Sequence, residues 1–269
     1  MKVVGVYLVR NEADVIETNL RHHFETVLAE AIVVDNGSSD GTLELLADLA
    51  DELPLQVASE LGHIFQSGRV TRMARFAVQQ GADWVLPLDA DEFWVAADRP
   101  FRSVLEAAPA DARALFVEVI NFVQQRDVLA VQPGVLRTMT LRPPHPVGTA
   151  EDASRLVRTG EVGWLELTYT PKCVLRGTPD IVVAPGNHLT GIDGGYATGA
   201  LACLHAPIRA RSILLQKIDH GRRLLEEHSS AEAGWHVKRW WQMARAGTLD
   251  EEWEALSSQD GAITVNGAR

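Results

Sequence analysis

Cysteine and basic residues are scarce in this sequence. Only two cysteines occur, Cys173 and Cys203, and they do not form a CxxC pair, which argues against a zinc knuckle or a redox motif. Buried free thiols are expected instead. Lys and Arg number 25 against 36 Asp and Glu, so the formal net charge is −11. Such a chain is not typical of nucleic-acid binding, because phosphate contacts require clustered Lys and Arg.

Long apolar runs are also missing. No stretch approaches the ~20 apolar residues that a membrane-spanning helix needs. The apolar run near the N-terminus, at 3–9, is too short for a signal peptide and no small-residue cleavage site follows it. We therefore expect a cytoplasmic protein whose contact with a membrane, if any, is peripheral. A GxGxxG loop is absent after the first expected strand, which argues against NAD(P) binding.

What the first hundred residues do contain is a regular alternation of strands and helices. Buried strands are expected at 2–9, 31–34, 55–58 and 84–88. Helical periodicity runs through 10–27, 37–53 and 66–80. This alternation predicts an α/β fold with a parallel sheet and helices on both faces. In the third helix, Met73, Phe76 and Ala77 are expected to point inward.

The remaining sequence has a different texture. A strand is expected at 114–122, and three prolines interrupt the chain near residue 145. Short segments follow at 163–169, 172–175 and 181–183, and a long helix is expected at 208–227. The 269 residues correspond to one large domain or two small ones. We interpret the second half as part of the same domain rather than as an independent one.

Two expected strands end in acidic residues. After the strand at 84–88 comes "DADE", which places Asp89 and Asp91 one residue apart. Ligands of open α/β sheets bind outside the carboxyl ends of the strands. A carboxylate pair in that place can present oxygens to Mg²⁺ or Mn²⁺, and the metal can bridge a diphosphate. The alternative is a solvated acidic turn; the strand-tip position and the adjacent Phe93 and Trp94 favour a functional site.

The other acidic tip is "VVDNGSSDGT" at 33–42. Asp35 is well placed to accept a hydrogen bond from a base imide or a ribose hydroxyl. Asn36 and Gly37 tolerate a left-handed turn. The stretch is equally compatible with a capped turn that leads into a helix, and taken alone it leaves both interpretations open.

Taken together, three motifs resemble the family 2 glycosyltransferases, which use nucleotide-sugars and have a GT-A fold. They are "LVRNEAD" at 8–14, "VVDNGSSDGT" at 33–42 and "DWVLPLDADEF" at 83–93. The chain departs from the pattern at Asn36, where the family has a second aspartate. The similarity is specific over residues 3–94 and weaker beyond them.

The resemblance implies a Rossmann-like, mostly parallel central sheet flanked by helices. Residues 1–100 would form the nucleotide-sugar-binding half and 101–207 a mixed acceptor-side half of the same domain. Residues 208–269 would form a C-terminal helical extension. The implied activity is metal-dependent transfer of a sugar from a nucleoside-diphosphate sugar to a hydroxyl of a glycan, a lipid-linked molecule or a small molecule. UDP is the commonest donor nucleotide of the family, with GDP and dTDP as alternatives.

The resemblance also implies roles for particular residues. Asn11 and Glu12 match the "NE" of the nucleotide pocket. Asp35 matches the acid that contacts the base or the ribose. Asp89 and Asp91 match the DxD pair, in which Asp91 is the preferred ligand of Mn²⁺ or Mg²⁺.

Later segments, "GNH" at 186–188 and "LHAPIRARS" at 204–212, resemble elements of a bacterial subgroup of these proteins. His205 is the preferred histidine ligand of the metal and His188 the second candidate. For each, a hydrogen-bonded core histidine is the alternative.

Positive charges are needed to hold an anionic donor on an acidic protein. Arg209 is expected to pair with a diphosphate oxygen. Arg72 and Arg69, in the helix before the DxD strand, either contact the nucleotide or phosphates or are solvated helix charges.

Family 2 enzymes invert the anomeric centre, which requires one general base near the acceptor. Asp152, in an "ED" pair, is the preferred base. Asp193 is the second candidate and Glu166 the third. A surface acid is the alternative for each.

The tryptophans near the C-terminus, Trp235, Trp240 and Trp241, have two interpretations. They could stack on an acceptor sugar, or they could pack a helix or build a homodimer interface; packing is favoured. For the whole chain, the alternatives to a glycosyltransferase are a nucleotidyltransferase of related topology and a non-catalytic nucleotide-sugar or glycan-binding module.

Overall fold

The computed structural model describes residues 1–61, 66–143, 153–159, 161–167, 169–187, 194–227, 235–257 and 263–264. The chain divides into two compact units. The first comprises Met1–Val119 and Thr170–His205, and the second comprises Ile120–Tyr169 and Ala206–Arg269. Among the described residues, no helix has both the length and the apolar content to cross a membrane.

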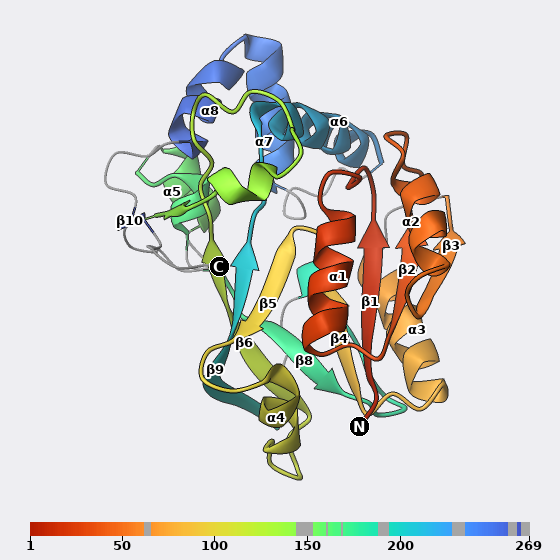
Figure 1. Cartoon of the computed structure of the whole chain (residues 1–269). Coiled ribbons are helices and arrows are strands. Elements are labelled where there is room, and N and C mark those ends of the chain that lie inside the picture. The colour runs from red at the N-terminus through yellow and green to blue at the C-terminus, as the bar shows by residue number, and fades with distance from the viewer. Residues whose placement is uncertain are drawn as a thin grey trace. The chain divides into compact units, whose positions relative to one another are not determined.

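An eight-stranded sheet runs through the first unit, in the order β3-β2-β1-β4-β8-β6-β9-β5 (Figure 1). Its strands are β1 (Val3–Val9), β2 (Glu30–Asp35), β3 (Leu55–Ser59), β4 (Trp84–Leu88), β5 (Glu92–Ala96), β6 (Ala114–Asn121), β8 (Lys172–Arg176) and β9 (Gly195–His205). The helices between the first four strands are α1 (Ile16–Thr26), α2 (Thr42–Ala50) and α3 (Gln66–Gln79). The predicted α/β class is confirmed.

The four strands nearest the N-terminus pair in parallel, as the alternation predicted. In the register, Val9 lies opposite Asp35, and Tyr7 lies opposite Leu88. Because the carboxyl ends of parallel strands meet at one edge, Asp35 and the acidic stretch after Leu88 lie at the same edge, on either side of β1.

The apolar side chains of this sheet alternate between two cores. Val4, Val6 and Val85 pack with Val70 and Met73 of α3, in a core that also contains Ile32, Val34, Ala74, Ala77, Cys173 and Leu175. The opposite face carries the fully buried Tyr7, whose ring meets that of His23 on α1. A strand with both faces covered reads as a continuous apolar run, which is why β1 and β2 were recognisable in the sequence.

The other half of the sheet is antiparallel. Strand β8 pairs antiparallel with β4 and β6, and β5 pairs antiparallel with β9. The strand expected at 114–122 is confirmed as β6, and the short segment at 172–175 lies in β8. Neither β5 nor β9 was expected, and the segment at 181–183 forms no strand. The "DADE" stretch is therefore a turn between two strands, and Glu92 already belongs to β5. The helix α4 (Phe101–Glu106) and the short helix η3 (Pro185–Asn187) complete the described elements of this unit.

The second unit contains the long helices α6 (Arg211–Glu227) and α7 (Trp235–Ala246) and the shorter α8 (Leu249–Leu256). It also contains η1 (Val135–Thr138), α5 (Ala153–Arg158), η2 (Trp164–Glu166) and a two-stranded sheet of β7 (Leu141–Arg142) and β10 (Ile263–Thr264). The short segment at 163–169 thus contains a helical turn.

The core of the second unit is built around an aromatic cluster. Trp240 is fully buried, and its indole Nε1 donates to Glu252 Oε1 at 2.7 Å. Trp164 stacks on His236 with ring centroids 5.0 Å apart and meets Trp240 edge-on. Because Trp240 lies in this core, it is not exposed for an acceptor sugar.

Candidate functional site

Asp35, at the tip of β2, is buried and shapes the turn that follows it. Its Oδ2 accepts the backbone N–H groups of Gly37 at 3.0 Å and Ser38 at 3.1 Å, and its Oδ1 accepts the hydroxyl of Ser38. Gly37 has φ +75°, a conformation that glycine adopts without strain. The turn interpretation of "VVDNGSSDGT" is therefore correct for the local structure. Two carboxylate oxygens offer about four acceptor positions, so a contact with a nucleoside is compatible with this turn.

The loop after β1 is tied to the same turn. The backbone N–H of Asn11 donates to Ser38 Oγ at 2.9 Å, and Asn11 Oδ1 accepts the N–H of Ser39 at 2.8 Å. Asn11 has φ +54°, which its short polar side chain tolerates. The N–H of Glu12 donates to Thr42 Oγ1 at 2.9 Å. The structure thus brings Asn11, Glu12 and Asp35 together at adjacent strand tips.

The two arginines of α3 behave differently. Arg69 is buried, and its Nη1 donates to Asn36 Oδ1 at 2.7 Å. A neutral amide at position 36, where the family pattern has aspartate, is held by this guanidinium. Arg72 has a side chain 64% exposed and pairs with Glu60 at 2.9 Å. Of the two, only Arg72 projects its charge into solvent.

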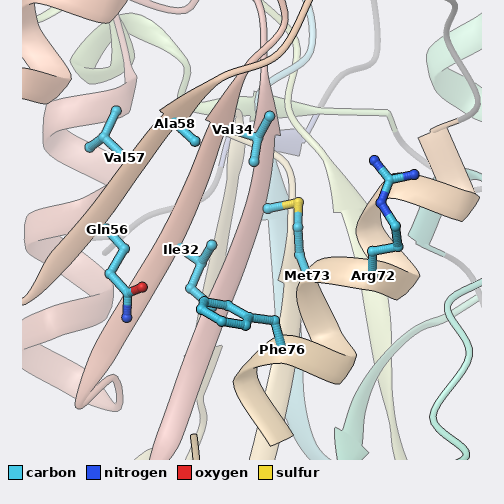
Figure 2. A pocket seen from close by; sticks show the side chains of 8 residues that line it. All are labelled: Ile32, Val34, Gln56, Val57, Ala58, Arg72, Met73 and Phe76. Atoms are coloured by element: carbon cyan, nitrogen blue, oxygen red, sulfur yellow. The ribbon is translucent and has the colours of Figure 1, made fainter. Parts of the chain in front are cut away.

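Beside Arg72 an apolar groove of about 310 Å³ runs between α3 and the edge of the sheet (Figure 2). It is lined by Ile32, Val34, Gln56, Val57, Ala58, Arg72, Met73 and Phe76. The expectation that Phe76 points into the core is wrong, because its side chain is 44% exposed and lies beside Ile32 in the groove. Helix α3 packs on β1 and β4, so the side toward the edge strand β3 stays open.

The second acidic tip surrounds a buried lysine. Lys172, the first residue of β8, lies beside the end of β4 because the two strands are antiparallel. Its ammonium contacts Asp89 Oδ2 at 2.9 Å, Glu92 Oε1 at 2.7 Å and the carbonyl oxygen of Gly186 at 2.6 Å. Three acceptors match the three N–H groups of an ammonium, so the hydrogen-bonding capacity of Lys172 is filled.

Asn187 holds the other oxygen of Asp89. Its Nδ2 donates to Asp89 Oδ1 at 2.9 Å, so each carboxylate oxygen of Asp89 has a donor. Asn187 is buried and has φ +58°, again in the left-handed region. Its Oδ1 is buried, and no donor to it lies within the described part of the chain.

Burial and charge oppose each other in this cluster. Burial alone would lower the pKa of Lys172, but the carboxylates of Asp89 and Glu92 raise that pKa above its usual value. Burial raises the pKa of Glu92 to about 8, although the Lys172 ammonium acts in the opposite direction. The lysine therefore stays charged and acts as a permanent counter-ion inside the acidic turn.

Asp91 faces a histidine rather than the lysine. Its Oδ1 lies 3.7 Å from Nε2 of His205, the last residue of β9. In the β5–β9 ladder His205 lies opposite Glu92, which explains how the imidazole comes to lie next to Asp91. The two atoms are close enough for both to coordinate one Mg²⁺ or Mn²⁺ at about 2.1 Å. No group of three or more Asp, Glu, His or Cys that could hold a metal occurs among the described residues.

Behind the turn, a hydrogen-bond network anchors β5 to α1. The side chain of Asn19 donates to the carbonyl oxygen of Glu92 at 2.6 Å, and the indole of Trp94 donates to Glu92 Oε2 at 3.2 Å. The N–H of Trp94 donates to His23 Nε2 at 3.2 Å, and His23 Nδ1 lies 2.9 Å from the carbonyl oxygen of Asn19. Burial, and next the adjacent His22, lower the pKa of His23 to about 3, so its ring stays neutral.

The remaining site residues predicted from the sequence lie elsewhere in the structure or outside its described residues. Arg209 belongs to the second unit, is buried, and donates from Nη1 to the carbonyl oxygen of Ala206 at 3.2 Å. Glu166 accepts the N–H of Gly163 at 2.6 Å within η2. The preferred base Asp152, the second candidate Asp193 and the metal candidate His188 lie outside the described residues.

Sequence reasoning did not single out Lys172 or Asn187. A lysine that opens the apolar strand "KCVLR" was the available signal for the first, because lysine is almost never fully buried unless it is paired. Asn187 lies within the "GNH" segment at 186–188, of which only His188 was considered as a site residue. The expected buried thiols, Cys173 and Cys203, are confirmed as free and buried.

No protein-family model and no curated protein matches the sequence. Among solved structures, TarS 1–349 of S. aureus in complex with UDP is 15% identical, with a TM-score of 0.43 over 80% of this chain and 63% of that one. This chain thus spans less than two thirds of that TarS fragment.

Two further solved structures resemble the chain. The mannosyltransferase PcManGT from Pyrobaculum calidifontis, in complex with GDP-Man and Mn²⁺, is 17% identical, with a TM-score of 0.38 over 94% of this chain and 73% of that one. A putative glucose-1-phosphate thymidylyltransferase from Bacillus anthracis is 9% identical, with a TM-score of 0.31 over 47% of this chain and 58% of that one. At such identities and TM-scores the function has to be argued from the residues of the site.

Proposed function

We propose that this protein is a metal-dependent glycosyltransferase of the GT-A type, resembling family 2, that transfers a sugar from a nucleoside-diphosphate sugar to an acceptor hydroxyl. One observation carries the proposal. Asp35 and the Asp89–Asp91 turn lie at the same edge of the sheet, on either side of β1, and Asp91 lies beside His205. An edge with one polar tip for a nucleoside and one acidic tip for a cation suits a nucleoside diphosphate.

The donor would lie along this edge. The nucleoside would contact the tip formed by Asn11, Glu12 and Asp35, and UDP is the preferred nucleotide. The diphosphate would lie toward Asp91 and His205, which would hold Mn²⁺ or Mg²⁺ between them. A bound divalent cation neutralises charge that develops on a leaving diphosphate. A net charge of −11 supports the need for such a cation.

In the proposed reaction, the acceptor hydroxyl oxygen bonds to the anomeric carbon of the sugar. The bond from that carbon to the diphosphate oxygen breaks, and the nucleoside diphosphate leaves with the electron pair. A carboxylate accepts the hydroxyl proton, and the anomeric configuration inverts. Asp152 is the proposed base and Asp193 the second candidate. Glu166 is a weaker candidate, because its Oε2 already accepts the N–H of Gly163.

The proposal is tested by donor binding and hydrolysis. The full chain is mixed with UDP-glucose, UDP-N-acetylglucosamine or GDP-mannose and Mn²⁺, and thermal stability and release of nucleoside diphosphate are measured. A bound donor should raise the melting temperature by mass action. Asp91→Asn should abolish metal-dependent hydrolysis, whereas the exposed Asp48→Asn should not.

Two results would contradict the proposal. Pyrophosphate release from a nucleoside triphosphate and a sugar phosphate, with no turnover of nucleotide-sugars, would identify a nucleotidyltransferase. Metal-independent binding of a nucleotide-sugar without turnover would identify a binding module.

A further inference from the structure

The aspartates of "DADE" have different partners. The oxygens of Asp89 are held by the Lys172 ammonium at 2.9 Å and by the amide of Asn187 at 2.9 Å, whereas Asp91 Oδ1 faces the imidazole of His205 at 3.7 Å. We propose that Lys172 is a positioning residue that binds Asp89 as a fixed counter-ion and so leaves Asp91 as the carboxylate that takes the divalent cation. This inference rests on the proposed function, because it assigns the metal within the same donor site.

The charge of Lys172 carries the first step. An ammonium in contact with Asp89 repels a second cation on the same carboxylate, and this repulsion is weakly screened in a buried site. Asp89 would also have to give up the hydrogen bond from Asn187 or from Lys172 to turn toward a metal. A divalent cation is therefore disfavoured at Asp89.

The chemistry of His205 carries the second step. A neutral imidazole is a metal ligand, whereas an ammonium is not. His205 lies opposite Glu92 in the β5–β9 ladder, so the backbone pairing itself brings Nε2 to Asp91. Asp89 therefore pairs with the ammonium of Lys172, and Asp91 binds the divalent cation from solution.

The rigidity of the lysine carries the third step. Lys172 is 4% exposed, and its remaining contacts, to Glu92 Oε1 and the carbonyl oxygen of Gly186, fill its hydrogen-bonding capacity. A lysine held at three points on a central strand cannot move aside when a metal arrives without leaving the buried Glu92 Oε1 without its ion-pair partner. It therefore acts as a part of the site's frame.

The test compares the Mn²⁺ affinities of variants of the two aspartates. Electron paramagnetic resonance measures Mn²⁺ binding, both with Mn²⁺ alone and with Mn²⁺ plus UDP. Asp91→Asn should weaken Mn²⁺ binding by about tenfold or more, because changing even a residue that only supports a metal ligand costs about 10–100-fold in affinity. Asp89→Asn should change it by less than about threefold, because Asp89 is not the proposed ligand and Lys172 stays paired with Glu92 at 2.7 Å. An Asp89→Asn variant that binds Mn²⁺ as weakly as Asp91→Asn would overturn the inference.

Lys172→Met sharpens the test. Without the ammonium, Asp89 becomes available to a metal, so Asp89→Asn should weaken Mn²⁺ binding strongly in the Lys172→Met background although it does little in the native chain. A residue with only a structural role would not produce this coupling. Lys2→Met is the matched control, because it also removes a lysine ion pair, with Glu30 at 2.7 Å, at the opposite edge of the sheet. An unchanged effect of Asp89→Asn in the Lys172→Met background would overturn the inference.

Two further outcomes separate this inference from the proposed function. If Lys172→Met does not fold, as judged by circular dichroism, the comparison of Asp89→Asn with Asp91→Asn decides the inference alone. If Mn²⁺ binding follows the expected pattern and no nucleotide-sugar is turned over, the inference holds and the glycosyltransferase proposal fails. A native chain that binds no Mn²⁺, with or without UDP, would overturn both.

Discussion

Asp91 Oδ1 and His205 Nε2 lie 3.7 Å apart at one end of the antiparallel ladder formed by β5 and β9. Asp91 belongs to the "DADE" motif, which is recognisable in the sequence. His205 belongs to β9, a strand that was not expected from the sequence. Their proximity follows from backbone pairing, since His205 lies directly opposite the residue that follows Asp91.

Metal removal should therefore act through this pair. After treatment with EDTA, UDP should no longer raise the melting temperature of the protein, and added Mn²⁺ should restore the effect. His205→Ala should weaken Mn²⁺ binding by about tenfold. His22→Ala is the control, because its imidazole contacts the carbonyl oxygen of Trp94 and not Asp91. Full stabilisation by UDP in EDTA would contradict the metal assignment.

Asp35 should contribute to both stability and nucleotide binding. Asp35→Ala removes the acceptor for the N–H groups of Gly37 and Ser38, which should lower the free energy of unfolding by about 1–3 kcal/mol. Urea denaturation measures this change, with the exposed Asp48→Ala as control. Calorimetry with UDP and Mn²⁺ should show weakened binding for Asp35→Ala at a temperature where the variant is folded. Unchanged UDP affinity would leave Asp35 with only its role in the turn.

The two arginines of α3 form a matched pair. Arg69→Ala leaves the buried Asn36 Oδ1 without its donor and should lower the free energy of unfolding by about 2 kcal/mol. Arg72→Ala removes an exposed pair with Glu60 and should change it by about 0.5 kcal/mol or less. If Arg72 contacts the phosphates of the donor, Arg72→Ala should also weaken nucleotide-sugar binding while leaving the free energy of unfolding nearly unchanged. Equal stability losses for the two variants would contradict the difference in their burial.

His23 should make the protein less stable in acid. Its pKa is about 3 in the folded protein, whereas an unperturbed histidine titrates near 6.5. Below pH 6.5 the unfolded chain binds a proton that the folded chain does not, so the free energy of unfolding falls as the pH decreases toward 3. This one group contributes a slope of up to about 1.4 kcal/mol per pH unit.

His23→Gln tests this origin of the acid sensitivity. Urea denaturation between pH 7 and pH 4 should show a shallower decline of stability for the variant than for the native chain. Parallel declines in the His23→Gln variant and the native chain would contradict the assignment.

Much of the first unit could be predicted from the sequence. The apolar runs of β1, β2 and β4, separated by helical periods, predicted the parallel half of the sheet, and that arrangement places Asp35 and Asp89 at one edge. Position along alternating elements was sufficient because parallel strands separated by helices all end at the same edge. The prediction that Phe76 points inward was wrong, because Phe76 is largely exposed. Helical periodicity alone does not show which side of α3 the sheet leaves uncovered.

The sequence by itself therefore determined the acidic tips, their order and their common edge, because these follow from local periodicity and the geometry of parallel strands. The tertiary structure alone decided what each acid contacts. Lys172 reaches Asp89, and His205 reaches Asp91, through antiparallel pairings of strands far apart in the chain. Such pairings depend on which strands become neighbours, which no local pattern contains. They turn two similar aspartates into one carboxylate held by a lysine and one that faces an imidazole.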